Sequence, residues 1–379
     1  MYRDLVCHEI PAESDDVRHI GVLKGEGVGP EVVDAALECL EAVAERFGLS
    51  YSLSYGGEIG KASERKCGAA LSSDVKEFCS AVLSRGGAIL TGAGGGRFVY
   101  DMRREFDLYC KLSPLRPFRV LGNAGCLKAS CSSGVDIMIV RENISGIYQG
   151  EWTLYEENGS PCAGHSFRYR EGEVMDILRA AARVSSVRSG RLCVVYKESG
   201  VPSISHLWRS CATRVESEFG VQCEMIDVDY AAYRLIREAT ELDVVVAPNL
   251  FGDVLSDLGA LLLGSRGMSY SANFSKTGAA VYQTNHGAAH DLAGTDRANP
   301  IGQVLSLGML IRETMGSAPA ANAIERAVQD VLQQGYRTFD ISEEGCHIVG
   351  TRELGERIAD QIRMMKSPVD DEIAGAVAN

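Results

Sequence analysis

The sequence lacks the features that mark a secreted, membrane-spanning or zinc-binding protein. Its twelve cysteines include no C-x-x-C pair, so we expect reduced, buried thiols rather than disulfide bonds or a zinc site. No apolar run is long enough to cross a bilayer, and residues 1–7 lack the apolar core of a signal peptide. Together these absences predict a cytoplasmic protein without a membrane partner.

Excess positive charge is also absent. The chain has 38 Lys and Arg against 51 Asp and Glu, a formal net charge of -13, and no basic stripe stands out. This balance argues against nucleic acids and anionic membranes as partners. It still allows a small anionic ligand, if a few arginines, lysines and a metal ion gather at one site. The length of 379 residues predicts two domains or one large α/β unit.

The most informative stretch spans residues 247–257. It follows an apolar run that predicts a buried strand, residues 243–247, and it opens an apolar segment that predicts a helix, residues 258–263. Asp253 and Asp257 are four apart, so on a helix both carboxylates project from one face at the C-terminal edge of a sheet. Such oxygen ligands suit Mg²⁺ or Mn²⁺ better than zinc. The alternative is a solvated first helical turn that complements the helix dipole.

The N-terminal part predicts a strand followed by a glycine turn. Residues 1–18 are polar and read as an irregular lead-in to a strand at residues 19–23. After it, Gly25, Gly27 and Gly29 alternate before a helix. This spacing does not match a dinucleotide-binding loop, and by itself it favours a tight turn, although glycine lets the backbone approach a ligand.

Two further predicted strands deliver arginines and a tyrosine. The strand at residues 88–92 ends in a glycine-rich loop and leads to an arginine cluster that contains Arg103. The strand at residues 135–140 delivers Arg141 and Tyr148 at its C-terminal end, where α/β proteins bind ligands. The alternative for clustered arginines is a solvated helix face.

A lysine follows the next buried strand. After a possible arm or hairpin at residues 152–173 and a helix, the strand at residues 192–196 leads to Lys197. Most lysines are surface charges, but one that is desolvated after a buried strand can act as a base near neutral pH. A long helical tail follows residue 300.

Four motifs in this order resemble the β-decarboxylating dehydrogenases, the family of isocitrate, isopropylmalate, homoisocitrate, tartrate and D-malate dehydrogenases. The likeness runs over residues 19–364. The motifs are the glycine turn at residues 25–31, Val140-Arg141-Glu142-Asn143 with Tyr148, Asn249-Leu250-Phe251-Gly252-Asp253 with Asp257, and His286-Gly287 with Asn299-Pro300.

The resemblance implies a two-domain α/β fold that is not a Rossmann fold. A small domain at residues 109–263, with the dimer interface and the metal site, is inserted into a large nucleotide-binding domain at residues 1–108 and 264–379. The resemblance also implies an obligate homodimer in which each active site draws on both subunits.

The resemblance further implies a role for each matching residue. Lys197, from the partner subunit, is the base for the substrate hydroxyl, and Tyr148 is the acid that protonates the carbon losing CO₂. Asp253 and Asp257 bind the divalent metal with Asp229 from the partner. The carboxylate clamps are Arg103 and Arg141, the loop residues that read the variable substituent are Val99 and Tyr100, and the nucleotide-site residues are His286, Gly287, Asp291 and Asn299.

The implied reaction is the NAD-dependent, metal-dependent oxidative decarboxylation of a 3-substituted (2R)-malate-type 2-hydroxy acid to a 2-oxo acid and CO₂. Mg²⁺ or Mn²⁺ is the expected metal. A carboxylate at Asp291 accepts hydrogen bonds from a ribose 2'-hydroxyl and repels a 2'-phosphate, which favours NAD over NADP.

The chain departs from the family pattern at four places. The second clamp arginine is replaced by Ser113, and Arg116 is a candidate for the displaced clamp. Glu198-Ser199 follow the lysine in place of Ala-Asn, and Gln283-Thr284-Asn285 replace Glu-Pro-Val. The loop at residues 92–101 is short and glycine-rich, unlike a standard isopropylmalate or isocitrate pocket.

Two alternatives stay open at this stage. One is a catalytically weak regulatory subunit or ligand-binding paralogue, which the changes at the clamp and nicotinamide positions would suit. The other is a metal-dependent alcohol dehydrogenase with histidine ligands, because His286 and His290 are four apart. We interpret His286 as the nucleotide-site histidine. We interpret His290 as a side chain that either has its hydrogen-bond partners within the protein or faces solvent.

Overall fold

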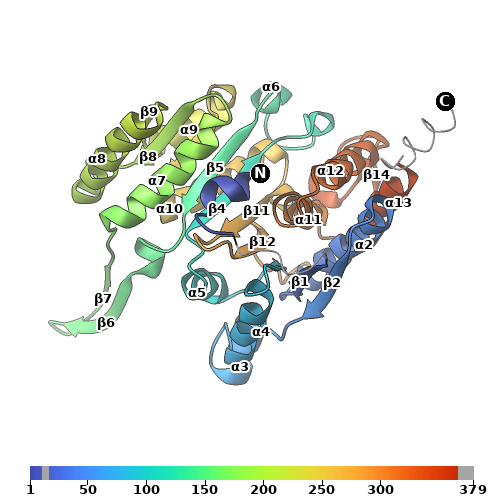
Figure 1. Cartoon of the computed structure of the whole chain (residues 1–379), viewed down its shortest axis with the longest axis horizontal. Helices are drawn as coiled ribbons and strands as arrows, with labels where there is room; N and C mark the ends of the chain where they lie inside the picture. The colour runs from blue at the N-terminus through green and yellow to red at the C-terminus, as the bar shows by residue number, and fades with distance from the viewer. Residues whose placement is uncertain (11–16, 366–379) are drawn as a thin grey trace.

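The fold, given by a computed structural model, is a mixed α/β structure built on one ten-stranded sheet (Figure 1). The structure describes residues 1–10 and 17–365. The strand order is β2-β1-β3-β12-β11-β4-β5-β10-β8-β9. These strands are β1 (Arg18–Leu23), β2 (Tyr51–Tyr55), β3 (Ala88–Thr91), β4 (Cys110–Leu115), β5 (Ile137–Glu142), β8 (Arg191–Tyr196), β9 (Gln222–Asp227), β10 (Val244–Ala247), β11 (Tyr270–Phe274) and β12 (Ala280–Thr284).

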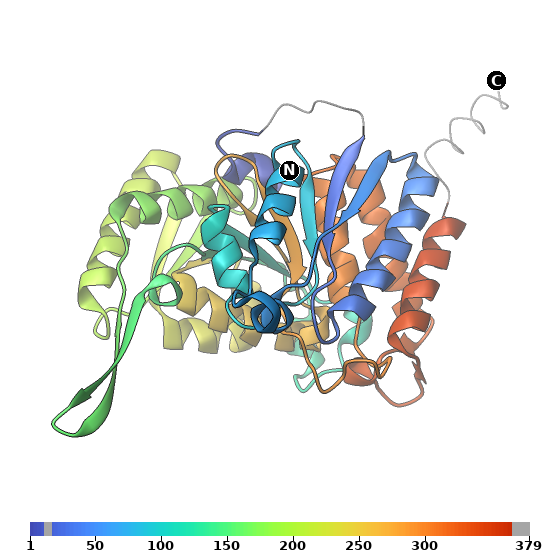
Figure 2. The ribbon, with the colours of Figure 1, turned by 90° about the horizontal axis from the view of Figure 1, so that it is seen from below.

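Helices cover both faces of this sheet (Figure 2). Helix α7 packs against β5, β8 and β10, α11 against β3, β11 and β12, and α10 against β4 and β5. The helices are α1 (Tyr2–Val6), α2 (Gly29–Phe47), α3 (Gly60–Cys67), α4 (Ser73–Leu83), α5 (Phe98–Glu105), α6 (Ala129–Ser132), α7 (Glu171–Ser186), α8 (Pro202–Phe219), α9 (Val228–Arg237), α10 (Asn249–Leu263), α11 (Ile301–Glu313), α12 (Ala318–Gln333) and α13 (Thr351–Met364).

The two halves of the sheet run in opposite directions. Strands β5, β10, β8 and β9 are parallel to one another, and β12, β3, β1 and β2 are likewise parallel. Between them β4 is antiparallel to β5 and to β11, and β11 is antiparallel to β12. The carboxyl ends of β3 and β5 therefore point to opposite edges of the sheet.

Most predicted elements are confirmed near their predicted bounds. The fully buried strands β5 and β10 match the apolar runs that predicted them. The arm is an antiparallel hairpin of β6 (Glu151–Glu157) and β7 (Ser160–Ser166), which projects from the body (Figures 1 and 2). The helical tail holds α11, α12 and α13, with a small sheet of β13 (Tyr336–Arg337) and β14 (His347–Ile348) before the last helix.

The N-terminal lead-in differs from its prediction. Residues 2–6 form α1, in which Val6 is fully buried. Arg3 is also buried, and its Nη2 atom donates to the carbonyl oxygen of Gly278 at 2.6 Å. Tyr109 donates from its hydroxyl to the carbonyl oxygen of Val6. The polar segment is thus partly helical and packed on the core, while residues 11–16 lie outside the described residues.

All twelve cysteines are free thiols, as predicted, but not all are buried. Cys67 and Cys126 are exposed. The expectation of buried thiols holds for Cys7, Cys39, Cys79, Cys110, Cys193 and Cys211. Within the described part of the chain, no helix combines the length and apolar character needed to cross a bilayer.

The glycine turn after β1 joins two loops that are distant in the sequence. Gly27 has φ +63, and a Cβ atom there would lie 1.8 Å from the carbonyl oxygen of Ala288. The same carbonyl accepts a hydrogen bond from the backbone N–H of Val28 at 2.8 Å. On the other side, the backbone N–H of Glu26 donates to the carbonyl oxygen of Ala93. The turn therefore holds the loop after β3 and the segment after β12 together.

We predict that Gly27→Ala destabilises the protein well beyond the cost of a positive φ. The methyl group forces Ala288 away and breaks the hydrogen bond from Val28, so we expect a loss of about 3 kcal/mol or more in the free energy of unfolding. Gly48→Ala is the matched control, because Gly48 has φ +64 and no atom within 4 Å of its added Cβ. It should cost about 1 kcal/mol. Equal losses in thermal or urea unfolding would contradict the prediction.

Candidate active site

A cavity of about 220 Å³ lies over the central strands, between α5 and α10. Its walls come from the loop after β3, from β4, from the end of β12 and from α10. It brings together seven of the residues predicted for the site, namely Val99, Tyr100, Arg103, Asp253, Asp257, His286 and Gly287. Residues that are distant in the sequence thus form one site on a face of the sheet.

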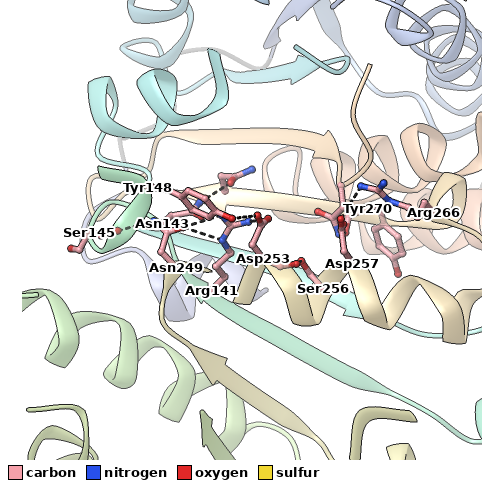
Figure 3. Close-up of polar contacts among 12 residues, drawn as sticks. Arg141, Asn143, Ser145, Tyr148, Asn249, Asp253, Ser256, Asp257, Arg266 and Tyr270 are labelled. Carbon is pink, nitrogen blue, oxygen red and sulfur yellow. Dashed lines mark hydrogen bonds and ion pairs between the residues drawn. The ribbon is translucent and has the colours of Figure 1, made fainter. Parts of the chain in front are cut away.

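Arg141 connects β5 to α10 at the base of this site (Figure 3). Its side chain is 1% exposed. Its Nε and Nη2 atoms donate to Oδ1 of Asn249 at 3.2 and 2.9 Å, and Nη1 forms an ion pair with Asp253. Gly252 leaves room for the arginine, since a Cβ atom there would lie 2.7 Å from Cγ of Arg141. This packing gives a physical reason for the Asn249-Leu250-Phe251-Gly252-Asp253 motif.

Tyr148 lies beside the same aspartate. It belongs to the short helix η2 (Ile147–Gln149), and its hydroxyl donates to Oδ2 of Asp253 at 2.9 Å. Burial and the charge of Asp253 raise the pKa of Tyr148, so the phenol keeps its proton. Its ring packs against Tyr100 with centroids 5.0 Å apart. A protonated phenol in this position suits a general acid.

Asp253 and Asp257 both face the cavity from α10, as their spacing predicts. Burial raises the pKa of Asp253, but the charges of Arg141 and Lys111 outweigh it and leave this pKa lowered. Asp257 pairs with Nη2 of Arg266 at 2.8 Å, and burial raises its pKa. Asp257 is therefore not part of a freely solvated helical turn.

The two carboxylates provide part of a metal site. Their oxygen atoms are the donors that Mg²⁺ and Mn²⁺ prefer. Within residues 1–10 and 17–365, no three His, Cys, Asp or Glu side chains are grouped as metal ligands. A single chain therefore fits a divalent cation only in part, and a further donor must come from elsewhere.

Lys197 and Asp229 do not line this cavity. Nζ of Lys197 pairs with Asp229 at 2.5 Å and with Asp227 at 3.1 Å, at the ends of β8 and β9. In the single chain the expectation of a desolvated Lys197 is wrong, because its side chain is 35% exposed and hydrogen bonds to Asp229 and Asp227 raise its pKa.

Arg116 lies away from the other site residues. Ser113 is buried in β4, and Arg116 follows the last residue of that strand. The guanidinium of Arg116 lies 3.5 Å from Asp136, just before β5, and 3.9 Å from Glu325 on α12. The start of β5 is the end opposite to Arg141, so the single chain does not bring Arg116 into the clamp.

Lys111 is a site residue that the sequence reasoning missed. It lines the cavity from β4 and is 3% exposed. Burial and the charges of Arg103 and Arg141 lower its pKa well below the usual range.

Arg103 is also buried, with its Nε atom lacking a hydrogen-bond partner within the described residues. Burial and the charge of Arg141 lower the pKa of Arg103 to about 9. The sequence feature that could have indicated Lys111 is its place two residues before position 113, where the family has an arginine.

A second cavity, of about 410 Å³, adjoins the first. The two share Arg266, His286 and Gly287. The second collects all of the predicted nucleotide residues, His286, Gly287, Asp291 and Asn299. His290 is 53% exposed in its side chain and lies 3.7 Å from Glu26, which agrees with the interpretation of a solvent-facing histidine.

Comparisons with known proteins agree with this arrangement. The profile of the isocitrate/isopropylmalate dehydrogenase family matches residues 19–358. The 3-isopropylmalate dehydrogenase of Aquifex aeolicus is 35% identical over 362 residues, which cover 92% of this chain and 98% of that protein. The 3-isopropylmalate dehydrogenase of Geobacillus kaustophilus is 38% identical over 354 residues, which cover 89% and 94%.

A solved structure gives the same result. The crystal structure of isocitrate dehydrogenase from Methylococcus capsulatus superposes with a TM-score of 0.82 at 26% identity, covering 92% of this chain and 100% of that one. This likeness confirms the predicted fold class. The chain therefore belongs to the isocitrate/isopropylmalate dehydrogenase family and is an oxidoreductase that acts on a CH–OH group.

Proposed function

We propose that this protein catalyses the NAD-dependent oxidative decarboxylation of a 3-substituted (2R)-malate-type 2-hydroxy acid, with Mg²⁺ or Mn²⁺. The observation that carries the proposal is the junction of the two cavities. One has buried cations facing a pair of carboxylates, and the other holds the predicted nucleotide residues. A small anion in the first cavity would lie next to a dinucleotide in the second.

The reaction converts the hydroxy acid and NAD⁺ into a 2-oxo acid, CO₂ and NADH, and the proton lost from the hydroxyl group balances the one gained by the carbon that loses CO₂. When bound, NAD accepts the hydride, and the divalent cation offsets the negative charge that develops on the oxygen of the reacting carbon. Arg103 and Arg141 hold the carboxylates in place. Lys197 removes the hydroxyl proton, and Tyr148 delivers a proton to the carbon that loses CO₂.

The remaining parts of the site are assigned to a second subunit. We infer that Lys197 and Asp229 of the partner subunit complete each cavity, with Asp229 joining Asp253 and Asp257 around the cation. The projecting hairpin supports an interface, because Trp152, Leu154 and Tyr155 are between 51% and 87% exposed on it. The domain boundaries at residues 109 and 263 and the cytoplasmic location stay predictions.

The cofactor preference rests on Asp291. Its carboxylate lines the second cavity and is exposed, so it can accept hydrogen bonds from a ribose. A 2'-phosphate in the same place would be repelled. We therefore assign NAD rather than NADP.

The first test is NADH formation, followed by absorbance, across 3-substituted malates with hydrogen, hydroxy, alkyl, carboxyalkyl and phosphonoalkyl substituents. We expect turnover of at least one member that requires Mg²⁺ or Mn²⁺ and releases CO₂ equal to the NADH formed. Asp253→Asn should reduce kcat by about 100-fold or more, since it removes a charge from the proposed metal site. A folded protein that binds NAD but oxidises no member would contradict the proposal.

A mixing experiment tests the shared site. Lys197→Ala and Asp253→Asn are each expected to be inactive as homodimers. If Lys197 acts in the partner's cavity, mixed dimers keep one intact site, and random exchange in an equal mixture restores about one quarter of the wild-type activity. If Lys197 acts within its own chain, the mixture stays inactive although dimers form.

Asp291→Lys should shift the cofactor preference towards NADP. Loss of the hydrogen bonds to the ribose and gain of a positive charge should raise the ratio of kcat/KM for NADP to that for NAD by about 10-fold or more. Glu41→Lys on α2 makes the same charge change at another exposed position and should leave the ratio unchanged. A wild-type protein that already prefers NADP would show that the role of Asp291 is wrong.

A further inference from the structure

Lys111 is a buried basic residue in the wall of the first cavity. Its side chain lies inside the central sheet at 3% exposure. Across residues 1–10 and 17–365, it takes part in no hydrogen bond or ion pair within the chain, yet it lines the cavity beside Asp253. Burying a charged group without a partner is strongly unfavourable, so a position of this kind points to a ligand.

The pairing register of β4 places the side chain of Lys111 on the face of the sheet that carries the active-site cavity. Lys111 lies directly opposite Arg141 on β5 and Asn273 on β11, and paired residues project from the same face of a sheet. Arg141 contacts Asp253 on α10, so this is the face that α10 covers. Farther along the same face, Leu115 packs against Gly259 of α10.

The neighbouring carboxylates are already engaged. Asp253 holds Arg141 on one oxygen and Tyr148 on the other, and Asp257 holds Arg266. Arg103, across the cavity, likewise has a buried Nε without a hydrogen-bond partner among the described residues. Two buried basic side chains therefore face the same space, and among the described residues neither is ion-paired with a carboxylate.

Neither Ser113 nor Arg116 can bind a substrate carboxylate in this cavity. Ser113 points to the same face of β4, because strand residues two apart share a face, but its side chain is short and uncharged. Arg116 lies five residues after Lys111, and an odd separation in a strand places two side chains on opposite faces of the sheet. In extended geometry this separation is also about 16 Å along the chain. It is held by Asp136 and Glu325 instead.

We propose that Lys111 binds a carboxylate or comparable anionic group of the hydroxy acid directly, together with Arg103, in place of the arginine that is absent at Ser113. This proposal rests on the proposed function, because it takes the hydroxy acid as the occupant of the cavity. It makes the position of the charge on β4 a determinant of which hydroxy acid is accepted.

Lys111→Met tests the proposal on the hydroxy acid that the wild type oxidises. Loss of one charge-assisted hydrogen bond should raise KM for that acid about 10- to 100-fold, while KM for NAD stays the same. Lys111→Arg should keep KM for the acid within about 10-fold of the wild type, because it retains the charge. The matched control is Lys276→Met, since Nζ of Lys276 pairs with Asp176 at 2.5 Å and lies outside the cavity lining. It should leave both KM values unchanged.

Thermal unfolding provides a readout that does not depend on turnover. If Lys111 had a purely structural role, its replacement would lower the Tm of the protein. An anchoring lysine is destabilising until its ligand binds, so Lys111→Met should have an equal or higher Tm without ligand. It should also lose most of the Tm increase that the hydroxy acid with Mg²⁺ gives the wild type.

The outcomes separate the two proposals. An unchanged KM and an unchanged ligand-induced Tm shift in Lys111→Met, with an active wild type, overturn the role of Lys111 alone. A wild type that neither oxidises nor is stabilised by any malate in the panel overturns the proposed function itself. If Lys111→Met does not fold, Lys111→Gln carries the same comparison, and a marked loss of stability in both variants shows that the lysine is structural.

Discussion

The contact between Arg141 and α10 is the constraint on which the active site depends. An arginine at 1% exposure needs its donors occupied, and Asn249 and Asp253 accept from them. Meeting that need fixes the start of α10 on β5 and sets the rotamer of Asp253, which then accepts a hydrogen bond from the hydroxyl of Tyr148. Gly252 is required because the arginine crosses the helix at that point. Removing the guanidinium would leave Oδ1 of the buried Asn249 and Oδ1 of Asp253 without the donors that they now have.

Around this contact the protein buries basic side chains that lack ion-pair partners within residues 1–10 and 17–365. The chain carries a net charge of -13, yet Lys111 and Arg103 are buried in one cavity, and neither forms an ion pair with a carboxylate of that part of the chain. A stable core would exchange such groups for apolar ones, so their presence is a cost in stability that a bound anion offsets. The acidic composition argues against nucleic acid and membrane partners while the local charge favours a small anion.

The sequence was sufficient for several buried strands and for the pair of aspartates, but not for the whole central sheet. Apolar runs marked β5 and β10, and the four-residue spacing placed Asp253 and Asp257 on one face of α10. Strands β4 and β11, where the sheet changes direction, were missed because neither is a continuous apolar run: Lys111 and Ser113 interrupt β4, and Ser271 and Asn273 interrupt β11. The short helix α1 was missed because five residues give too little periodicity. Lys111 was missed because its segment was not predicted as a strand, and most lysines are surface charges.

The alternation of a β-strand explains why the substituted clamp is a lysine at 111 rather than an arginine at 116. Positions 111, 113 and 115 of β4 face α10. Position 116 does not share this alternation, and it lies at the far end of the strand. On β4, therefore, a cation can reach the cavity only from position 111 or 113. Placing it at 111 sets it directly opposite Arg141, two residues nearer the Asp253 end of α10. The anion site is thus shifted along the strand while the carboxylate pair and Tyr148 stay fixed, and substrate choice can change without altering the groups that carry out the chemistry.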